Sequence, residues 1–176
     1  NARDAMPQGG RLTLTTTNAC PSASLPLHLV INMDASLSMI PNGKLDRAKQ
    51  ATRGFVQRID FDTSMVGVTS FSDRGYVETE LTDSRAKVLG AIAGIDTEGG
   101  TDIEGGWREA QKLLQRARGK QTDPNAPEPL EVVVILSDGQ PEPPSRNGRS
   151  IANKLKSDGV VIFSVCVGVT TSSRWP

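Results

Sequence analysis

The sequence predicts an α/β domain with a Rossmann-like, open and mostly parallel sheet that has helices on both faces. Two segments, 25–33 and 160–169, are apolar at both alternating positions, which is typical of parallel strands covered on both sides. Strand and helix patterns also alternate along the chain, and right-handed crossovers leave few ways to connect them. A chain of 176 residues is long enough for one hydrophobic core without a metal or a disulfide.

In the first half of the chain, apolar spacing assigns each element in turn. After the strand at 25–33, a helix is predicted over Lys44–Ile59, with one apolar face formed by Leu45, Ala48, Phe55 and Ile59. Residues 65–71 then form a second strand. Following a turn at 72–75, residues 76–81 form a short antiparallel edge strand.

The second half continues the alternation with two helices, a strand, a helix and a final strand. Residues 84–95 have helical character, and the next helix has a regular apolar stripe at Ile103, Trp107, Ala110, Leu114 and Ala117. A buried strand is predicted at 132–136, a helix at 150–157 and the last strand at 160–169. The expected order is therefore β-α-β-β-α-α-β-α-β.

The chain is predicted to consist of an N-terminal extension and one domain. Residues 1–24 are predicted to be an N-terminal extension or a linker from a neighbouring domain, and 25–176 form the domain proper. No signal-like segment starts the chain, so we expect a domain of a larger protein. A disulfide between Cys20 and Cys166 would suit an extracellular location, but a thiol at Cys166 would also pack well in a strand, and both alternatives stay open.

Charge and hydropathy exclude two classes of partner. The chain has 20 Lys and Arg against 20 Asp and Glu, so the basic excess typical of nucleic-acid binding is absent. No apolar run reaches the roughly 18 residues needed to cross a bilayer. We therefore expect neither nucleic-acid binding nor direct membrane insertion.

Oxygen-bearing side chains follow the predicted strands at three points of the chain. Asp34, Ser36 and Ser38 come after the first strand, Thr101 precedes the long helix, and Asp138 follows the strand at 132–136. Ligands of such sheets bind beyond the carboxyl ends of the strands, so these side chains are expected to converge there. Carboxylates and hydroxyls suit a hard cation, whereas the single His and the two Cys lack metal-ligand spacing. The sequence predicts a Mg²⁺ or Mn²⁺ site whose open position takes an acidic side chain of a partner.

This pattern resembles the metal-ion-dependent adhesion site of the von Willebrand factor type A family. The resemblance extends from about 25 to 169, and its motif residues are Asp34-x-Ser36-x-Ser38, Thr101 and Asp138-Gly139. It implies that the two serines bind the ion directly, the threonine directly or through water, and the two aspartates mainly through waters. A Glu or Asp of the protein ligand would supply the remaining oxygen.

The sequence departs from the family pattern in two places. Ala35 and Leu37 stand where the family often has Gly, and Leu37 would add an apolar side chain beside the site. We expect the metal to bind with an altered ligand preference. The family's last helix and edge strand are not recognisable after Val169.

Several alternatives remain at this level. The residues Asp34, Ser36 and Ser38 also suit a turn and a helix cap. The leading function is a non-enzymatic, cation-dependent adhesion module at the cell surface or outside the cell, and the resemblance also allows an intracellular assembly subunit that works beside an ATPase. A Mg²⁺-dependent phosphohydrolase with Asp34 as nucleophile is disfavoured, because Ser36 stands where such enzymes have their second aspartate.

Overall fold

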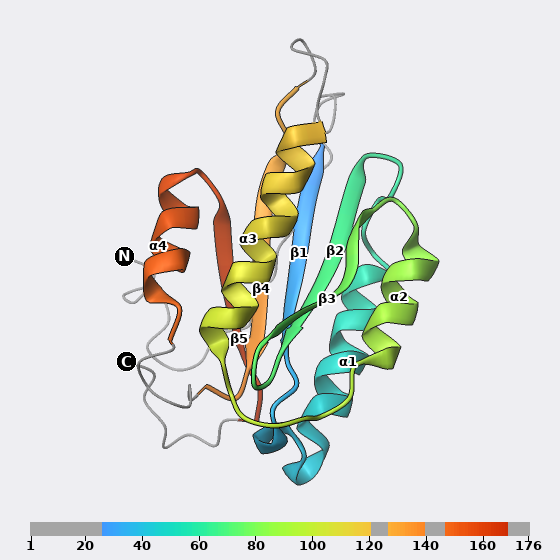
Figure 1. Cartoon of the computed structure of the whole chain (residues 1–176). Helices are drawn as coiled ribbons and strands as arrows, with labels where there is room; N and C mark the ends of the chain where they lie inside the picture. Colours follow the sequence, from blue (N-terminus) through green and yellow to red (C-terminus); the bar gives the residue numbers. More distant parts are fainter. Residues whose placement is uncertain (1–25, 121–126, 140–146, 169–176) are drawn as a thin grey trace, which may run out of the picture.

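The computed structural model describes residues 26–120, 127–139 and 147–168, which form a five-stranded sheet with helices on both faces (Figure 1). The predicted fold class is confirmed. The strands are β1 (Leu27–Asp34), β2 (Ser64–Phe71), β3 (Gly75–Thr82), β4 (Leu130–Ser137) and β5 (Val161–Cys166). The α-helices are α1 (Lys44–Val56), α2 (Arg85–Gly94), α3 (Ile103–Lys120) and α4 (Arg149–Ser157), and two short 3-10 turns, Leu37–Met39 and Pro41–Gly43, precede α1.

The sheet has the order β3-β2-β1-β4-β5, so β1 is its central strand. Strand β1 pairs in parallel with β2 and β4, and β4 pairs in parallel with β5. The predicted antiparallel edge strand is β3, but it is not short, because it has eight residues like its neighbour β2. Because four strands run in the same direction, their carboxyl ends meet at one edge of the sheet.

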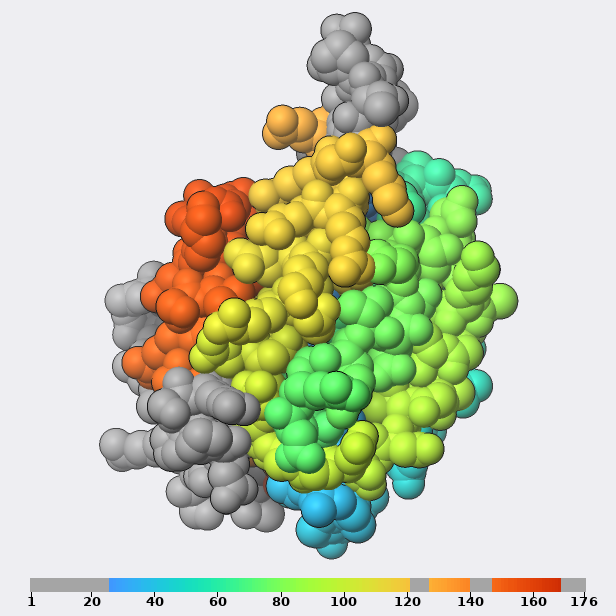
Figure 2. Space-filling model, in the orientation of Figure 1, coloured from blue at the N-terminus to red at the C-terminus, as the bar shows by residue number. Residues whose placement is uncertain are grey.

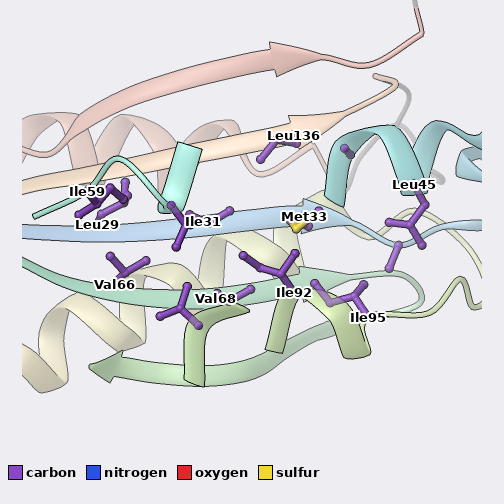
Figure 3. Packing of buried hydrophobic residues seen from close by; sticks show 14 of the residues in the cluster. Leu29, Ile31, Met33, Leu45, Ile59, Val66, Val68, Ile92, Ile95 and Leu136 are labelled. Atoms are coloured by element: carbon purple, nitrogen blue, oxygen red, sulfur yellow. The ribbon is translucent and has the colours of Figure 1, made fainter. Parts of the chain in front are cut away.

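Two hydrophobic clusters hold the helices on opposite faces of the sheet. On one face, α1 and α2 pack over Leu29, Ile31 and Met33 of β1, as Figure 3 shows from close by. On the other face, α3 and α4 pack over the alternate residues of the sheet, and Figure 2 shows α3 crossing this face between α4 and β3. Each fully buried Leu, Ile or Met side chain stabilises the fold by about 1.5–3 kcal/mol.

Two details of the predicted helices differ from the structure. Helix α1 ends at Val56, which is fully buried, whereas Phe55 is 46% exposed instead of lying on the apolar face. In α3, Trp107 and Ala110 are buried as predicted, but the stripe reaches only partial burial at Ala117. The buried face of α1 is formed by Leu45, Ala48, Thr52 and Val56, so Phe55 lies beside this face and not on it.

Strand β5 corrects the expectation of a strand covered on both faces. Ile162 faces α4 and is partly buried, whereas Val161, Phe163 and Val165 are 40–48% exposed. The physical reason is its position, because β5 is an edge strand and the described part of the chain covers only one of its faces. Cys166 ends this strand and is exposed, while Cys20 lies outside the described residues, so their pairing stays untested. No helix in the described ranges is long and apolar enough to cross a bilayer.

Candidate metal centre

Asp34, the last residue of β1, is fully buried and is the acceptor of three hydrogen bonds. Its Oδ1 accepts from the backbone N–H of Ser36 at 2.9 Å and from the Ser36 hydroxyl at 2.5 Å, and its Oδ2 accepts from the Ser137 hydroxyl at 2.6 Å. Burial raises the pKa of Asp34, and the hydrogen bonds from Ser137 and Ser36 oppose this rise. Donors on both carboxylate oxygens are the arrangement that an ionised carboxylate prefers.

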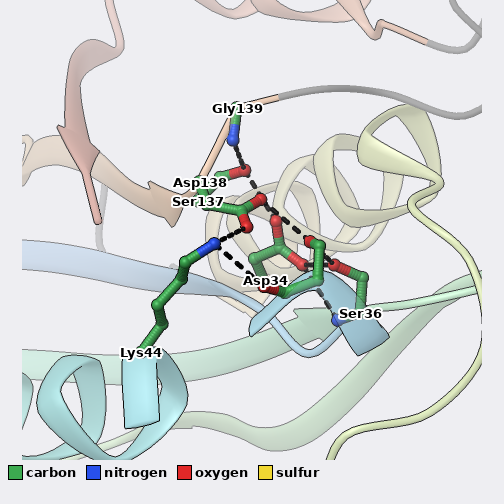
Figure 4. A network of polar contacts seen from close by, with 7 residues as sticks. Asp34, Ser36, Lys44, Ser137, Asp138 and Gly139 are labelled. Atoms are coloured by element: carbon green, nitrogen blue, oxygen red, sulfur yellow. Dashed lines mark hydrogen bonds and ion pairs between the residues drawn. The ribbon is translucent and has the colours of Figure 1, made fainter. Parts of the chain in front are cut away.

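A chain of polar contacts runs outward from Asp34 to Asp138 (Figure 4). The hydroxyl oxygens of Ser36 and Ser38 lie 2.9 Å apart, and the Ser38 hydroxyl donates to Oδ1 of Asp138 at 2.9 Å. This chain joins four of the five predicted site residues by direct contacts. It starts at the fully buried Asp34 and passes through Ser38, which is exposed and could be reached by a ligand, to the half-buried Asp138.

The chain from Asp34 to Asp138 has three contacts but only two hydroxyl protons to form them. The hydroxyls of Ser36 and Ser38 have one proton each, and if both aspartates are ionised these protons point toward Asp34 and Asp138. The contact between the two hydroxyl oxygens then has no proton, so lone pairs face each other. A proton on a carboxylate or a cation beside the hydroxyl oxygens would relieve this arrangement. The donor set therefore fits a hard cation.

The loop that contains Thr101 is attached to the first loop through the main chain. The Glu98 N–H donates to the Ala35 carbonyl at 2.8 Å, and the Leu37 N–H donates to the Gly99 carbonyl at 3.3 Å. Thr101 is only 6% exposed, so it lies beneath the surface of this loop. The structure thus holds Thr101 in place through its neighbours, in contrast to the direct contacts among the other four residues.

Asp73, in the turn after β2, explains why glycines stand in the Thr101 loop. Its Oδ1 accepts from the Gly100 N–H at 2.5 Å, and Gly99 has a left-handed φ of +51°. A Cβ atom at Gly99 would lie 2.1 Å from the Asp73 carboxylate. A side chain at Gly99 would therefore displace the Asp73 carboxylate and strain the left-handed backbone at Gly99.

Two residues of the network were missed by the sequence analysis. Ser137 donates to Asp34 and accepts from the Gly139 N–H at 3.0 Å, so it connects the ends of β1 and β4. Lys44 donates from Nζ to Oδ2 of Asp138 at 2.7 Å and to the Ser38 carbonyl at 3.0 Å. The adjacency of Ser137 to Asp138 was a usable signal, whereas nothing in the sequence pattern indicated the contact of Lys44.

The predicted apolar neighbour of the site is present. Leu37 is 52% exposed beside Ser36 and Ser38, and Ala35 is buried. No group of three or more His, Cys, Asp or Glu side chains with metal-binding geometry occurs in the described ranges. A cation held at these loops would therefore depend on hydroxyl oxygens as well as on the two carboxylates.

The sheet topology and these loops define a class of protein, and the comparison with known families agrees. Residues 29–140 match the von Willebrand factor type A domain family, and the chain belongs to this family. It is 28% identical to human calcium-activated chloride channel regulator 1 over 150 residues, which are 81% of this chain and 15% of that protein. The mouse protein of the same name is 28% identical over 145 residues, which are 77% of the chain and 14% of that protein. The chain thus spans about one seventh of the length of these relatives.

Solved structures show the same fold. Proximal thread matrix protein 1 from the mussel byssus, solved with a zinc-occupied MIDAS motif, has a TM-score of 0.60 and 26% identity, covering 80% of this chain and 35% of that one. An aerotolerance-related membrane protein from Bacteroides fragilis has a TM-score of 0.66 and 19% identity, covering 85% of this chain and 72% of that one. The second likeness concerns the fold alone.

Proposed function

We propose that this domain is a divalent-cation-dependent protein-binding module, whose cation site is built by Asp34, Ser36, Ser38, Thr101 and Asp138. The observation that carries the proposal is the chain of contacts from Asp34 to Asp138, in which two hydroxyl oxygens face each other at 2.9 Å. Mg²⁺ or Mn²⁺ matches this set of hard oxygen ligands. The bound ion would supply the positive charge that coordinates a Glu or Asp side chain of a partner protein.

The residues around the ion have separate roles in this proposal. Ser36 and Ser38 would present hydroxyl oxygens to the ion, and Asp34 and Asp138 would hold these hydroxyls from either side. Ser137 fixes the orientation of the Asp34 carboxylate from the neighbouring strand. Leu37, exposed beside the site, would add an apolar contact to the partner.

The environment of Asp34 favours a binding module over an enzyme. A nucleophilic carboxylate needs an oxygen that a substrate can reach, but Asp34 is fully buried and both of its oxygens accept hydrogen bonds. Asp34 is therefore well placed to orient Ser36 and poorly placed to attack a substrate. This supports a non-enzymatic role and disfavours the phosphohydrolase alternative.

We further propose that the domain comprises residues 25–176 of a larger protein, with 1–24 as an extension, and that it acts outside the cell or at its surface. The support comes from the likeness to proximal thread matrix protein 1 from the mussel byssus, at 26% identity. An intracellular assembly role beside an ATPase has no specific observation in its favour.

Isothermal titration of the metal-stripped domain with Mg²⁺ and Mn²⁺ tests the proposal. Saturable binding is expected for the wild type and for a Ser157→Ala control, since Ser157 lies at the end of α4, away from the site. Binding should be lost in the Ser36→Ala, Ser38→Ala double variant. Circular dichroism should show that all three proteins are folded. Equal binding in the wild type and the double variant would refute the site.

A further inference from the structure

Lys44 lies in a position that the helix itself does not favour. It is the first residue of α1, where the helix dipole attracts negative charge and disfavours a cation. The residue before it, Gly43, is left-handed with a φ of +62° and provides no side-chain cap. A lysine here therefore needs another stabilising contact.

That contact is the carboxylate of Asp138. Lys44 Nζ lies 2.7 Å from Oδ2 of Asp138 and 3.0 Å from the Ser38 carbonyl. Figure 4 shows the Lys44 side chain reaching from α1 to this network. The two side chains are only 19% and 11% exposed, so water screens this pair less than a surface ion pair. The ammonium group thus contacts two of the residues that the proposed function assigns to the cation site.

We propose that Lys44 is a counter-ion of the cation site that weakens divalent-cation binding and, in exchange, strengthens the attraction of the cation-bound site for an acidic partner. This inference rests on the proposed function. Lys44 lies outside the motif, and in this proposal it sets the relative affinity of the site for its two ligands, the divalent cation and the acidic side chain of the partner.

The charges of the network explain both effects. With Asp34 and Asp138 ionised, Lys44 reduces the net charge of the group from −2 to −1. A divalent ion then leaves the group at +1, which attracts a carboxylate, whereas without Lys44 the group would become neutral. The positive charge of Lys44 also repels the ion directly. Affinity at oxygen sites follows the ligand charge, so Lys44 should lower the affinity for the cation.

Titration of the metal-stripped domain with Mn²⁺ measures the first effect. Lys44→Met, which is similar in shape but uncharged, should bind Mn²⁺ about tenfold more tightly than the wild type. Lys44→Arg keeps the charge and should stay within about twofold of the wild type. The control is Lys49→Met on the same helix. This substitution removes an equal charge from the domain, but Lys49 contacts the Ala93 carbonyl of α2 and not the site.

The same titration in acetate measures the second effect, with acetate as the carboxylate probe and a reference titration of Mn²⁺ into acetate alone. Acetate should strengthen Mn²⁺ binding more in the wild type and in Lys49→Met than in Lys44→Met. An equal effect in all proteins, or none, would overturn the role in attracting the partner.

The outcomes separate this inference from the proposed function. If the wild type binds Mn²⁺ but Lys44→Met binds it equally or more weakly, Lys44 is a positioning residue for Asp138 and the inference is wrong, while the cation site stands. If the wild type does not bind Mn²⁺, the proposed function fails and the inference fails with it. Thermal denaturation of each variant verifies that the differences do not come from unfolding.

Discussion

The two ends of β1 differ in how far their buried polar atoms are hydrogen-bonded. At the carboxyl end, Asp34 is fully buried and accepts three hydrogen bonds from two segments of the chain. At the amino end, His28 lines a cavity of about 310 Å³ together with Met65, Leu81 and Leu113, and its buried Nδ1 has no hydrogen-bond partner within the described residues.

This difference follows from the surroundings of the two ends of β1. The carboxyl end gathers loops from several strands, so their main chains and hydroxyls can satisfy a buried charge. The amino end is lined mainly by apolar side chains, and there a neutral ring is preferred. Burial lowers the pKa of His28, with Glu131 opposing the effect.

Asp34→Asn should produce the largest change and tests the buried charge directly. Burial raises the pKa of Asp34, so its ionised form is costly without a cation, but an amide nitrogen would face the hydroxyl donor Ser137 in place of an acceptor oxygen. The two effects oppose each other, so the free energy of unfolding of the metal-free domain should change by no more than about 1 kcal/mol. Mn²⁺ binding should weaken at least about 100-fold. Urea denaturation and calorimetric titration measure the stability and the binding, respectively. A variant that is less stable and still binds Mn²⁺ would show that this end of β1 is only a structural network.

Ser137→Ala should have an intermediate effect at the same end. It removes the donor to Oδ2 of Asp34 and the acceptor of the Gly139 N–H. We expect a loss of about 1–2 kcal/mol in the free energy of unfolding and about tenfold weaker Mn²⁺ binding. Ser157→Ala, whose hydroxyl contacts only the Lys154 carbonyl in the described structure, serves as the control for both measurements. Unchanged Mn²⁺ binding would mean that Ser137 does not position Asp34.

The smallest effect is expected at the amino end, as a dependence of stability on pH. The pKa of His28 in the folded domain lies below its ordinary value of 6.5, so the unfolded chain binds the proton more readily. The contribution of His28 to stability is therefore complete above pH 6.5 and is lost as the pH falls below it. Urea denaturation at a series of pH values should show this loss in the wild type and a smaller one in His28→Leu. Parallel profiles for the two proteins would contradict the assignment.

Much of the fold was predictable because its signals are local. Strand and helix periodicity depends on neighbouring residues, and it located all five strands and all four α-helices of the described structure. The burial of β5 was predicted wrongly, because apolar residues show what a strand can bury and not what the rest of the chain covers. Phe163 is exposed because the described part of the chain covers only the opposite face of β5.

Some residues of the candidate site were also predictable from the sequence, and others were not. Asp34, Ser36 and Ser38 are close in sequence, and the parallel sheet predicted that Asp138 would join them. Ser137 could have been added by the same argument, because it stands next to Asp138 at the end of the same strand. The contact of Lys44 with Asp138 spans 94 positions and has no signal in the sequence pattern. Whether Thr101 serves as a ligand stays a prediction, because it is Glu98 and Gly99 that join its loop to the first loop.

The sequence by itself determined the elements, the class of fold and the chemistry of the residues at the strand ends, since these follow from spacing and side-chain type. The tertiary structure decided which charges meet. The pairing of β1 with β4 places Asp34 beside Ser137, and the start of α1 places Lys44 against Asp138. The net charge of the site depends on these contacts, because electrostatic energy depends on distance in space and not on separation along the chain.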